Sequence, residues 1–415
     1  MIDNHYPTFR SGIDIQPVTQ DGKPHLYLRD PLQLSEDSLL LPRALGVVLA
    51  LCDGTQPDAN ALSAAAAIRY GVSLPPRAIE NLLAALDQAF LLENQAYARA
   101  RAQALAAYRQ APFRPPASAG HSYPAEPEAL RRQLDGYLAQ ATDSQPALAV
   151  GGRVRGLVSP HIDYLRGGPV YAQVWKPAAD MVRQADLAVI LGTNHFGDGL
   201  ITLTRQNYAT PYGTLPTAAA VVDQLAAAMG PAAFEGELFH RGEHSVELAA
   251  VWLHHMRGGR PIDLVPVLCG SLGRHLDGQM IEEDPAIDQF VRALGAAAAG
   301  RNVVVIAAGD LAHVGPAFGG EPVDQAGRAQ LQAADAELME RICQGDAAGF
   351  WAANRAVDDQ YNVCGMSPIY LTLRLLGPGR GERVGYALCP ADEADTSVVS
   401  ICGIVLAPRA PDATG

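Results

Sequence analysis

The feature that most constrains the fold is a series of short, nearly continuous apolar runs that begins after residue 150. Runs such as "LAVILG" and "NVVVIAAG" are rich in Val, Ile and Leu and alternate with longer helical patterns, for example over 214–229 and 285–300. Buried sheets that are covered by helices need strands of this kind. The sequence therefore predicts an α/β fold, with strands over 153–159, 187–192, 262–269, 302–309, 383–389 and 397–407.

A second module precedes these runs, because 415 residues are more than one compact core usually holds. Residues 1–108 are predicted to form a small, mainly helical, winged-helix-like domain. The segment "RQAPFRPPASAG", 109–120, lacks apolar periodicity and is rich in Pro, which predicts a linker. Residues 121–415 are predicted to form the α/β domain. Within the small module we expect a strand over 24–31 and helices over 39–55, 59–71 and 75–92.

The net charge, the apolar runs and the spacing of the cysteines limit the possible functions and the cellular location of the protein. The net charge is −13 and no Lys/Arg cluster occurs, which argues against nucleic-acid binding and favours a small-molecule or peptide substrate. No unbroken apolar run of about 18 residues occurs, and the N-terminus has no secretion signal, so we expect a cytoplasmic protein without membrane spans. The six cysteines form no CxxC pair, which is typical of reduced thiols.

Polar residues follow three of the predicted strands. The strand ends read "PHIDY", "TNHFGDG" and "DLAHVG". In open α/β sheets ligands bind outside the carboxyl ends of the strands, so these residues are candidates for one pocket. A single histidine at a strand end is more often an ordinary loop residue. Asp310 has a simpler interpretation as a turn or helix-cap residue that accepts hydrogen bonds from backbone N–H groups. Three such ends together favour a site made of His161, Asp163, His195, Asp310 and His313.

Cys364 in "YNVCGMSPI" has two interpretations. It is either a small buried apolar residue or a ligand at the start of a helix that begins near Gly365, where the helix dipole favours a thiolate. Two histidines and one cysteine suit a transition metal.

The stretch "GEHSVELAAVWLHHM" adds Glu243 and His244 just before a predicted helix. They are either support for the pocket or ordinary polar residues at a helix start, and the sequence leaves both open. His254 and His255 come late in that helix, where a cation suits the dipole, and we expect both at the surface. The remaining histidines carry no signal: His5, His25, His121, His240 and His275.

Taken in order, these motifs resemble those of the Memo family, which includes the protein B component of bacterial AmmeMemoRadiSam systems. The similarity covers 121–407 and includes "HSYPAEPEALRRQLDGYL", "SPHIDYLRGGPVYA", "LGTNHFG", "GEHSVELAAVWL", "IDLVPVLCG", "GDLAHVG" and "NVCGMSPI". The family resembles class III extradiol dioxygenases in fold. The resemblance implies a central sheet with flanking helices and a metal pocket.

The resemblance also implies roles for the candidate residues. The metal ligands fall on His161, His195 and Cys364, with Fe(II) favoured and Cu or Zn as alternatives. His313 matches the acid/base position of the dioxygenases, with Asp310 beside it. The dioxygenases have a carboxylate where this chain has the cysteine, which puts dioxygenase activity in question.

This chain departs from the family pattern close to the site. A motif often seen as "PHAGY" is "PHIDY" here, and an "NHH"-like doublet is "NHF". Asp163, Glu243 and His244 are the candidates for substrate contact. The first hundred residues resemble PqqD-like winged-helix modules, and the family context implies a radical SAM enzyme and other AmmeMemoRadiSam components as partners.

Three functions remain open from the sequence. The first is a non-haem metal-dependent redox enzyme in which His313 moves a proton. The second is a non-catalytic protein that handles metal or binds a partner through the same pocket. The third is a hydrolase with Cys364 as nucleophile, His313 as base and Asp310 to orient that base.

Overall fold

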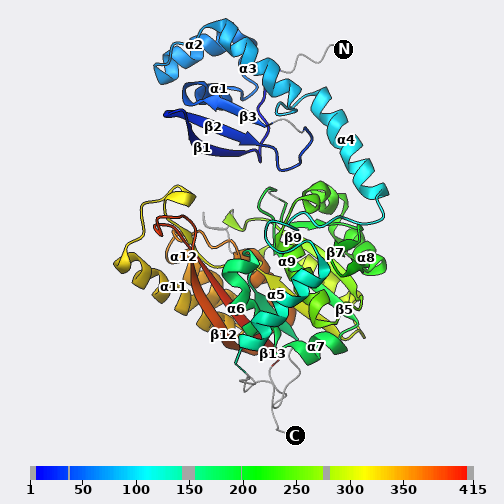
Figure 1. Ribbon diagram of the computed structural model, residues 1–415. Helices are drawn as coiled ribbons and strands as arrows, with labels where there is room; N and C mark the ends of the chain where they lie inside the picture. The colour runs from blue at the N-terminus through cyan, green and yellow to red at the C-terminus, as the bar shows by residue number, and fades with distance from the viewer. Residues whose placement is uncertain (1–5, 36–37, 143–154, 198, 274–280, 409–415) are drawn as a thin grey trace. The chain divides into compact units, whose positions relative to one another are not determined.

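The computed structural model describes residues 6–35, 38–142, 155–197, 199–273 and 281–408. His5 and His275 lie outside these ranges. The chain divides into two compact units, Met1–Ala111 and Pro112–Gly415, which are described separately below (Figure 1). In the part of the chain that is described, no helix is both long and apolar enough to cross a membrane.

The small unit contains a three-stranded antiparallel sheet in the order β1-β2-β3. A two-residue turn joins the first two strands, and both of its residues, Asp21 and Gly22, have positive φ, as this hairpin type requires. The expected strand at 24–31 is thus confirmed, and it pairs on both sides. The strands are β1 (Asp14–Gln20), β2 (Lys23–Arg29) and β3 (Leu39–Pro42).

The helix predicted over 39–55 is wrong in its first part. Leu39 and Leu41 belong to β3 and pair with Leu28 and Leu26, so cross-strand pairing overrides the helical spacing of these leucines. A 3-10 turn, η1 (Arg43–Leu45), leads into a shorter helix. The helices of the unit are α1 (Gly46–Leu51), α2 (Ala59–Tyr70), α3 (Pro76–Gln88) and α4 (Gln95–Gln110). The winged-helix assignment stays a prediction.

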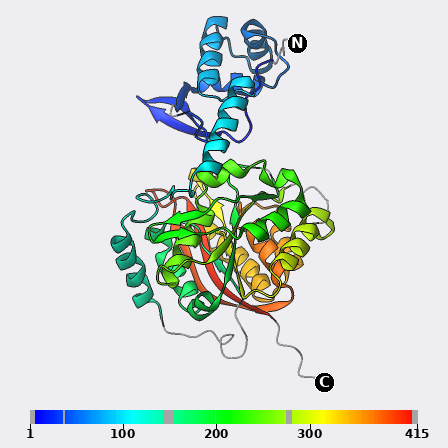
Figure 2. The same cartoon turned by 90° about the vertical axis from the view of Figure 1, so that its right-hand side faces the viewer.

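The large unit is built on an eight-stranded sheet in the order β11-β13-β4-β10-β5-β9-β6, with β12 paired to β13. The four central strands are parallel, and β6 and β13 flank them antiparallel. The long strands β12 and β13, red in Figures 1 and 2, run side by side. All six runs predicted as strands contain one, so the α/β prediction is confirmed. These strands are β4 (Gly156–Ser159), β5 (Leu187–Thr193), β9 (Asp263–Cys269), β10 (Val303–Ala308), β12 (Gly379–Pro390) and β13 (Val398–Pro408).

Helices cover both faces of this sheet, and each face has its own apolar core. One core joins the sheet to α5 (Pro127–Gln140), α6 (Tyr164–Trp175), α7 (Ala179–Gln184) and α9 (Ser245–Met256). The other joins it to α8 (Ala219–Met229), α10 (Pro285–Ala297), α11 (Gln325–Cys343), α12 (Ala347–Arg355) and α13 (Met366–Leu376). The short strands are β6 (Ile201–Leu203), β7 (Tyr208–Thr210), β8 (Gly213–Leu215) and β11 (His313–Val314).

The segment expected to be a linker, 109–120, differs from that expectation over much of its length. Arg114 is fully buried and forms an ion pair with Glu247 of α9. The backbone N–H groups of Ala117 and Ser118 donate to the same carboxylate, at 2.9 and 2.8 Å. A buried carboxylate needs such partners, and they hold this Pro-rich segment within the large unit.

Candidate metal centre

Three neighbouring parallel strands each bring one candidate residue to the same edge of the sheet. His161 follows β4 by two positions, Asp310 follows β10 by two, and His195 follows β5 by two. Because β10 lies between β4 and β5, their carboxyl ends are adjacent. The convergence expected from the three strand ends is therefore present in the structure.

Cys364 joins this group through a close approach of two backbone segments. Gly365 donates its N–H to the carbonyl of Asp310 at 2.9 Å. A Cβ atom on Gly365 would lie 2.5 Å from that carbonyl oxygen, and one on Gly309 would lie 2.6 Å from the Cα of Gly365. Only glycine permits this contact. It seats the N-terminal end of α13 against the end of β10, and Gly365 caps that helix as predicted.

His161 is held in one orientation by its surroundings. Its Nδ1 lies 3.0 Å from the carbonyl oxygen of Ala308, and its backbone N–H donates to Asp310 at 2.8 Å. A carbonyl only accepts, so Nδ1 carries the proton and Nε2 presents a lone pair. That Nε2 lies 3.2 Å from the Sγ atom of Cys364. Burial, together with neighbouring His195, lowers the pKa of His161 to about 3, so the ring is neutral near pH 7.

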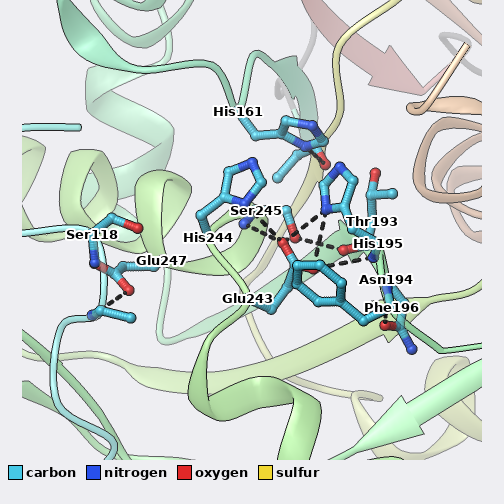
Figure 3. A network of polar contacts seen from close by, with 12 residues as sticks. Ser118, His161, Thr193, Asn194, His195, Phe196, Glu243, His244, Ser245 and Glu247 are labelled. Atoms are coloured by element: carbon cyan, nitrogen blue, oxygen red, sulfur yellow. Dashed lines mark hydrogen bonds and ion pairs between the residues drawn. The ribbon is translucent and has the colours of Figure 1, made fainter. Parts of the chain in front are cut away.

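Glu243 orients His195 in the same way. Both carboxylate oxygens lie 3.0 Å from Nδ1, and one also accepts the backbone N–H of His195 (Figure 3). Removal from water by itself lowers the pKa of His195, but the charge and hydrogen bonds of Glu243 outweigh this and leave that pKa raised. Burial alone would raise the pKa of Glu243, yet its histidine partners lower it well below the usual range. Nε2 of His195 is thus the free ligand atom.

His244 places a third imidazole in the cluster. Its ring stacks on His195 with centroids 4.8 Å apart and meets His161 edge-on at 5.2 Å (Figure 3). The exposed fraction of the side chain rises from 2% for His161 to 26% for His195 and 36% for His244. The cluster is therefore buried on one side and open to solvent on the other.

Among the described residues, two groups of three side chains have ligand atoms that all lie within 4.8 Å of one another, and both groups include His161. One consists of His161, His195 and His244, and the other of His161, Asp310 and Cys364. The sequence left open whether His244 supports the pocket, and it did not predict a third imidazole in the cluster. Its signal was the adjacent Glu243, whose carboxylate serves both neighbouring histidines.

The thiol of Cys364 is not ionised by the helix dipole as expected. Burial, with the nearby charge of Asp310, raises the pKa of Cys364 well above its ordinary value. The short α13 dipole does not offset the loss of water. In the metal-free chain the S–H group is the donor to Nε2 of His161.

Asp310 and His313 lie next to the cluster with opposite pKa shifts. Burial raises the pKa of Asp310, although the neighbouring histidines lower it in part. Burial lowers the pKa of His313, while Asp310 acts against this. His313 sits in the short strand β11, half-buried, with its ring edge-on to Phe318. In both groups burial is the largest cause of the shift, because removal from water disfavours the charged form.

The carboxylate of Asp163 is bound by Arg166 at the start of α6. It caps the N-terminus of α6 by accepting from the N–H of Arg166 at 3.0 Å, and it pairs with the Arg166 guanidinium at 2.6 Å. The predicted substrate contact of Asp163 stays a prediction.

The expectation that His254 and His255 lie at the surface is wrong. Every residue of α9 is buried, because the helix lies between the sheet and an outer layer. His255 contacts Tyr212 and Asp135, and His254 bonds to Thr210. Sequence reasoning also passed over the buried pair of Arg114 and Glu247, for which a glutamate within the apolar "SVELAAVWL" was the available signal.

Two cavities border the loop after β5. The larger, about 400 Å³, has mostly apolar walls that include Leu200 and Phe239. The smaller, about 180 Å³, is lined in part by Thr193 and Cys364 and so adjoins the cluster. Asn194 borders both.

Most of the large unit is similar in sequence to known proteins. A family model described as Memo-like protein matches residues 114–405. A MEMO1 family protein of Methanopyrus kandleri is 31% identical over 310 residues, which span 70% of this chain and 98% of that protein. A MEMO1 family protein of Methanosarcina acetivorans is 29% identical over 299 residues, or 69% of this chain and 96% of its own length. One from Aquifex aeolicus is 24% identical over 307 residues, or 74% and 75%.

Proposed function

The chain belongs to the Memo-like family, and on that premise we propose that its large unit is a metal-dependent redox enzyme acting on a small molecule or peptide. One observation carries the proposal: a buried imidazole nitrogen of His161 faces the thiol of Cys364 at 3.2 Å, beside the solvent-facing ring of His195. These three residues are the proposed ligands of a divalent transition ion, with Fe(II) favoured and Cu or Zn as alternatives.

The donor atoms are of the kind that such an ion prefers, and His161 lies within 4.8 Å of both other proposed ligands. Nδ1 of both histidines is occupied by a carbonyl or carboxylate partner, which leaves Nε2 of each ring as a lone-pair donor. A third donor, the sulfur of Cys364, supplies negative charge once its proton leaves. When bound, the ion supplies Lewis acidity and redox chemistry to a ligand at its open positions.

The chain's own residues have three roles in this proposal. Glu243 fixes the ring of His195, and the carbonyl of Ala308 fixes that of His161. His313, kept mainly neutral by burial, accepts a proton from the substrate, and the charge of Asp310 stabilises the resulting imidazolium. The exposed side of the cluster admits the substrate.

Two measurements on the full chain test this function. Protein purified without chelator should contain about one transition metal ion per chain by elemental analysis. Metal-loaded protein should consume O₂ only with a substrate, and removal of the metal should abolish this. If the protein contains the metal but shows no turnover, the proposed metal centre is supported and the proposed enzyme activity is contradicted.

A non-catalytic, metal-handling role is the second candidate, because His244 offers a further imidazole. The ligand nitrogens of His161, His195 and His244 all lie within 4.8 Å of one another and could hold an ion without the thiol of Cys364. A cysteine hydrolase has less support. The thiol of Cys364 has a pKa raised well above its ordinary value, and its imidazole partner is His161, whereas that mechanism needs His313.

A further inference from the structure

The smaller cavity adjoins the proposed metal centre on the side of α13. Cys364 belongs to its wall and also donates to His161 in the cluster. Thr193 is a second shared wall residue, and its hydroxyl donates to the carbonyl of Cys364 at 2.9 Å. A molecule bound at the cluster therefore has this cavity as its neighbouring space.

Asn354, which belongs to the lining of the cavity, has a buried side-chain acceptor without a partner among the described residues. Asn354 of α12 is only 2% exposed, and its Nδ2 donates to Asp359 at 3.1 Å. Because a carboxylate only accepts, this bond fixes which end of the amide is which. The remaining atom, Oδ1, has no hydrogen-bond partner among the described residues. Such an atom costs free energy unless a donor reaches it.

The other walls of the cavity favour a donor that carries positive charge. Asp359 brings a carboxylate, and the described lining contains no Lys, Arg or His. Trp351 adds an aromatic wall, and aromatic rings attract cations. An acceptor, an anion and an indole together suit a protonated amine better than a hydroxyl or a carboxylate.

We propose that this cavity, lined by Asn354, Asp359 and Trp351, binds a primary ammonium group of the substrate. The inference rests on the proposed function, since it makes the cavity the specificity pocket of the same centre. The substrate is then a small amine whose other end reaches the side of the cluster formed by His195 and Cys364.

Binding of simple probes to the metal-free full chain tests the proposal. We expect n-propylammonium to bind at least about tenfold more tightly than n-propanol, and propionate to show no binding, measured by calorimetry. Asp359→Asn should weaken n-propylammonium by about tenfold. Asp358→Asn is the matched control, because this neighbouring aspartate is exposed, shares the positive φ and does not line the cavity. It should leave binding unchanged.

Asn354→Leu provides a second variant that removes the unpaired oxygen without changing charge, and it should also weaken n-propylammonium. Circular dichroism and metal content check that both variants keep the loop that carries Cys364. Equal binding of n-propylammonium and n-propanol, no binding of any probe, or full binding by folded Asp359→Asn would each overturn the proposal. Metal content separates the two hypotheses. If wild-type protein purified without chelator contains no metal but still prefers n-propylammonium, the proposed function is contradicted and the proposed ammonium pocket is supported.

Discussion

The Nε2 atom of His161 lies 3.2 Å from the Sγ atom of Cys364, although 203 positions separate the two residues. In the metal-free chain the thiol donates to this nitrogen, since burial keeps the sulfur protonated and the ring neutral. A metal ion between the two atoms has to displace that proton. We therefore expect the proposed metal binding at this site to depend on pH through Cys364.

Replacement of Cys364 should deplete the metal with little change in fold. Cys364→Ser keeps the shape but offers a hydroxyl that stays protonated near pH 7, so we expect affinity to fall at least about tenfold. Affinity should also depend less on pH, by about one proton per ion bound. Cys343→Ser, in α11 and away from the cluster, is the control and should keep full metal. Full occupancy in Cys364→Ser, by elemental analysis of folded protein, would make this residue an ordinary buried thiol.

His313→Ala should keep the metal and change catalysis. The ring of His313 contacts Phe318 and the carbonyl of Leu311, and the proposed ligands lie elsewhere. Metal stoichiometry should stay near that of wild type, while the acidic limb of the pH–rate profile is lost. Loss of the metal from folded His313→Ala would instead assign this histidine to the ligand set.

Glu243→Gln should loosen the metal and lower the pKa of His195. The carboxylate raises that pKa by charge and hydrogen bonding, so the neutral amide leaves removal from water as the dominant influence. NMR titration of the ring in metal-free protein should report the shift. Loss of such an orienting partner weakens metal binding by about 10–100-fold. An unchanged pKa would mean that Glu243 does not control this ring.

Stability of the metal-free chain should depend on pH through the same pair. His195 has a raised pKa, so its contribution is complete below its unfolded value of 6.5 and is lost as pH rises through the folded value. Glu243 has a lowered pKa, so its contribution is present above its unfolded value of 4.5 and is lost as pH falls. The difference in melting temperature between wild type and Glu243→Gln should peak between pH 4.5 and 6.5. A difference that grows above this window would contradict the assignment.

Arg114→Ala should destabilise the large unit strongly. It leaves the buried carboxylate of Glu247 without its cation, which costs about 3–5 kcal/mol. It also removes the guanidinium that donates to the carbonyl of Glu243 at 2.8 Å. Arg205→Ala breaks an exposed pair with Asp223 and should cost about 0–1 kcal/mol in the same denaturant titration. Similar costs for the two variants would show that Arg114 does not stabilise the unit.

The sequence by itself determined the α/β class and the strand ends that carry the candidate ligands. Buried parallel strands are nearly continuous apolar runs, so "LAVILG" and "NVVVIAAG" identify themselves by composition. Polar residues that come directly after such apolar runs are easy to recognise by the contrast in composition. His161, His195 and Asp310 could therefore be placed at one edge before any contact was known.

Only the tertiary structure decided which groups meet and in which ionisation state. Cys364 reaches His161 because two glycines let the backbones of 309 and 365 approach, a contact without local sequence pattern. Burial then outweighs the helix dipole and keeps the thiol protonated. The partnership of Arg114 with Glu247 spans 133 positions and turns part of an expected linker into buried structure. Such contacts and desolvation depend on how distant segments pack, which local periodicity does not encode.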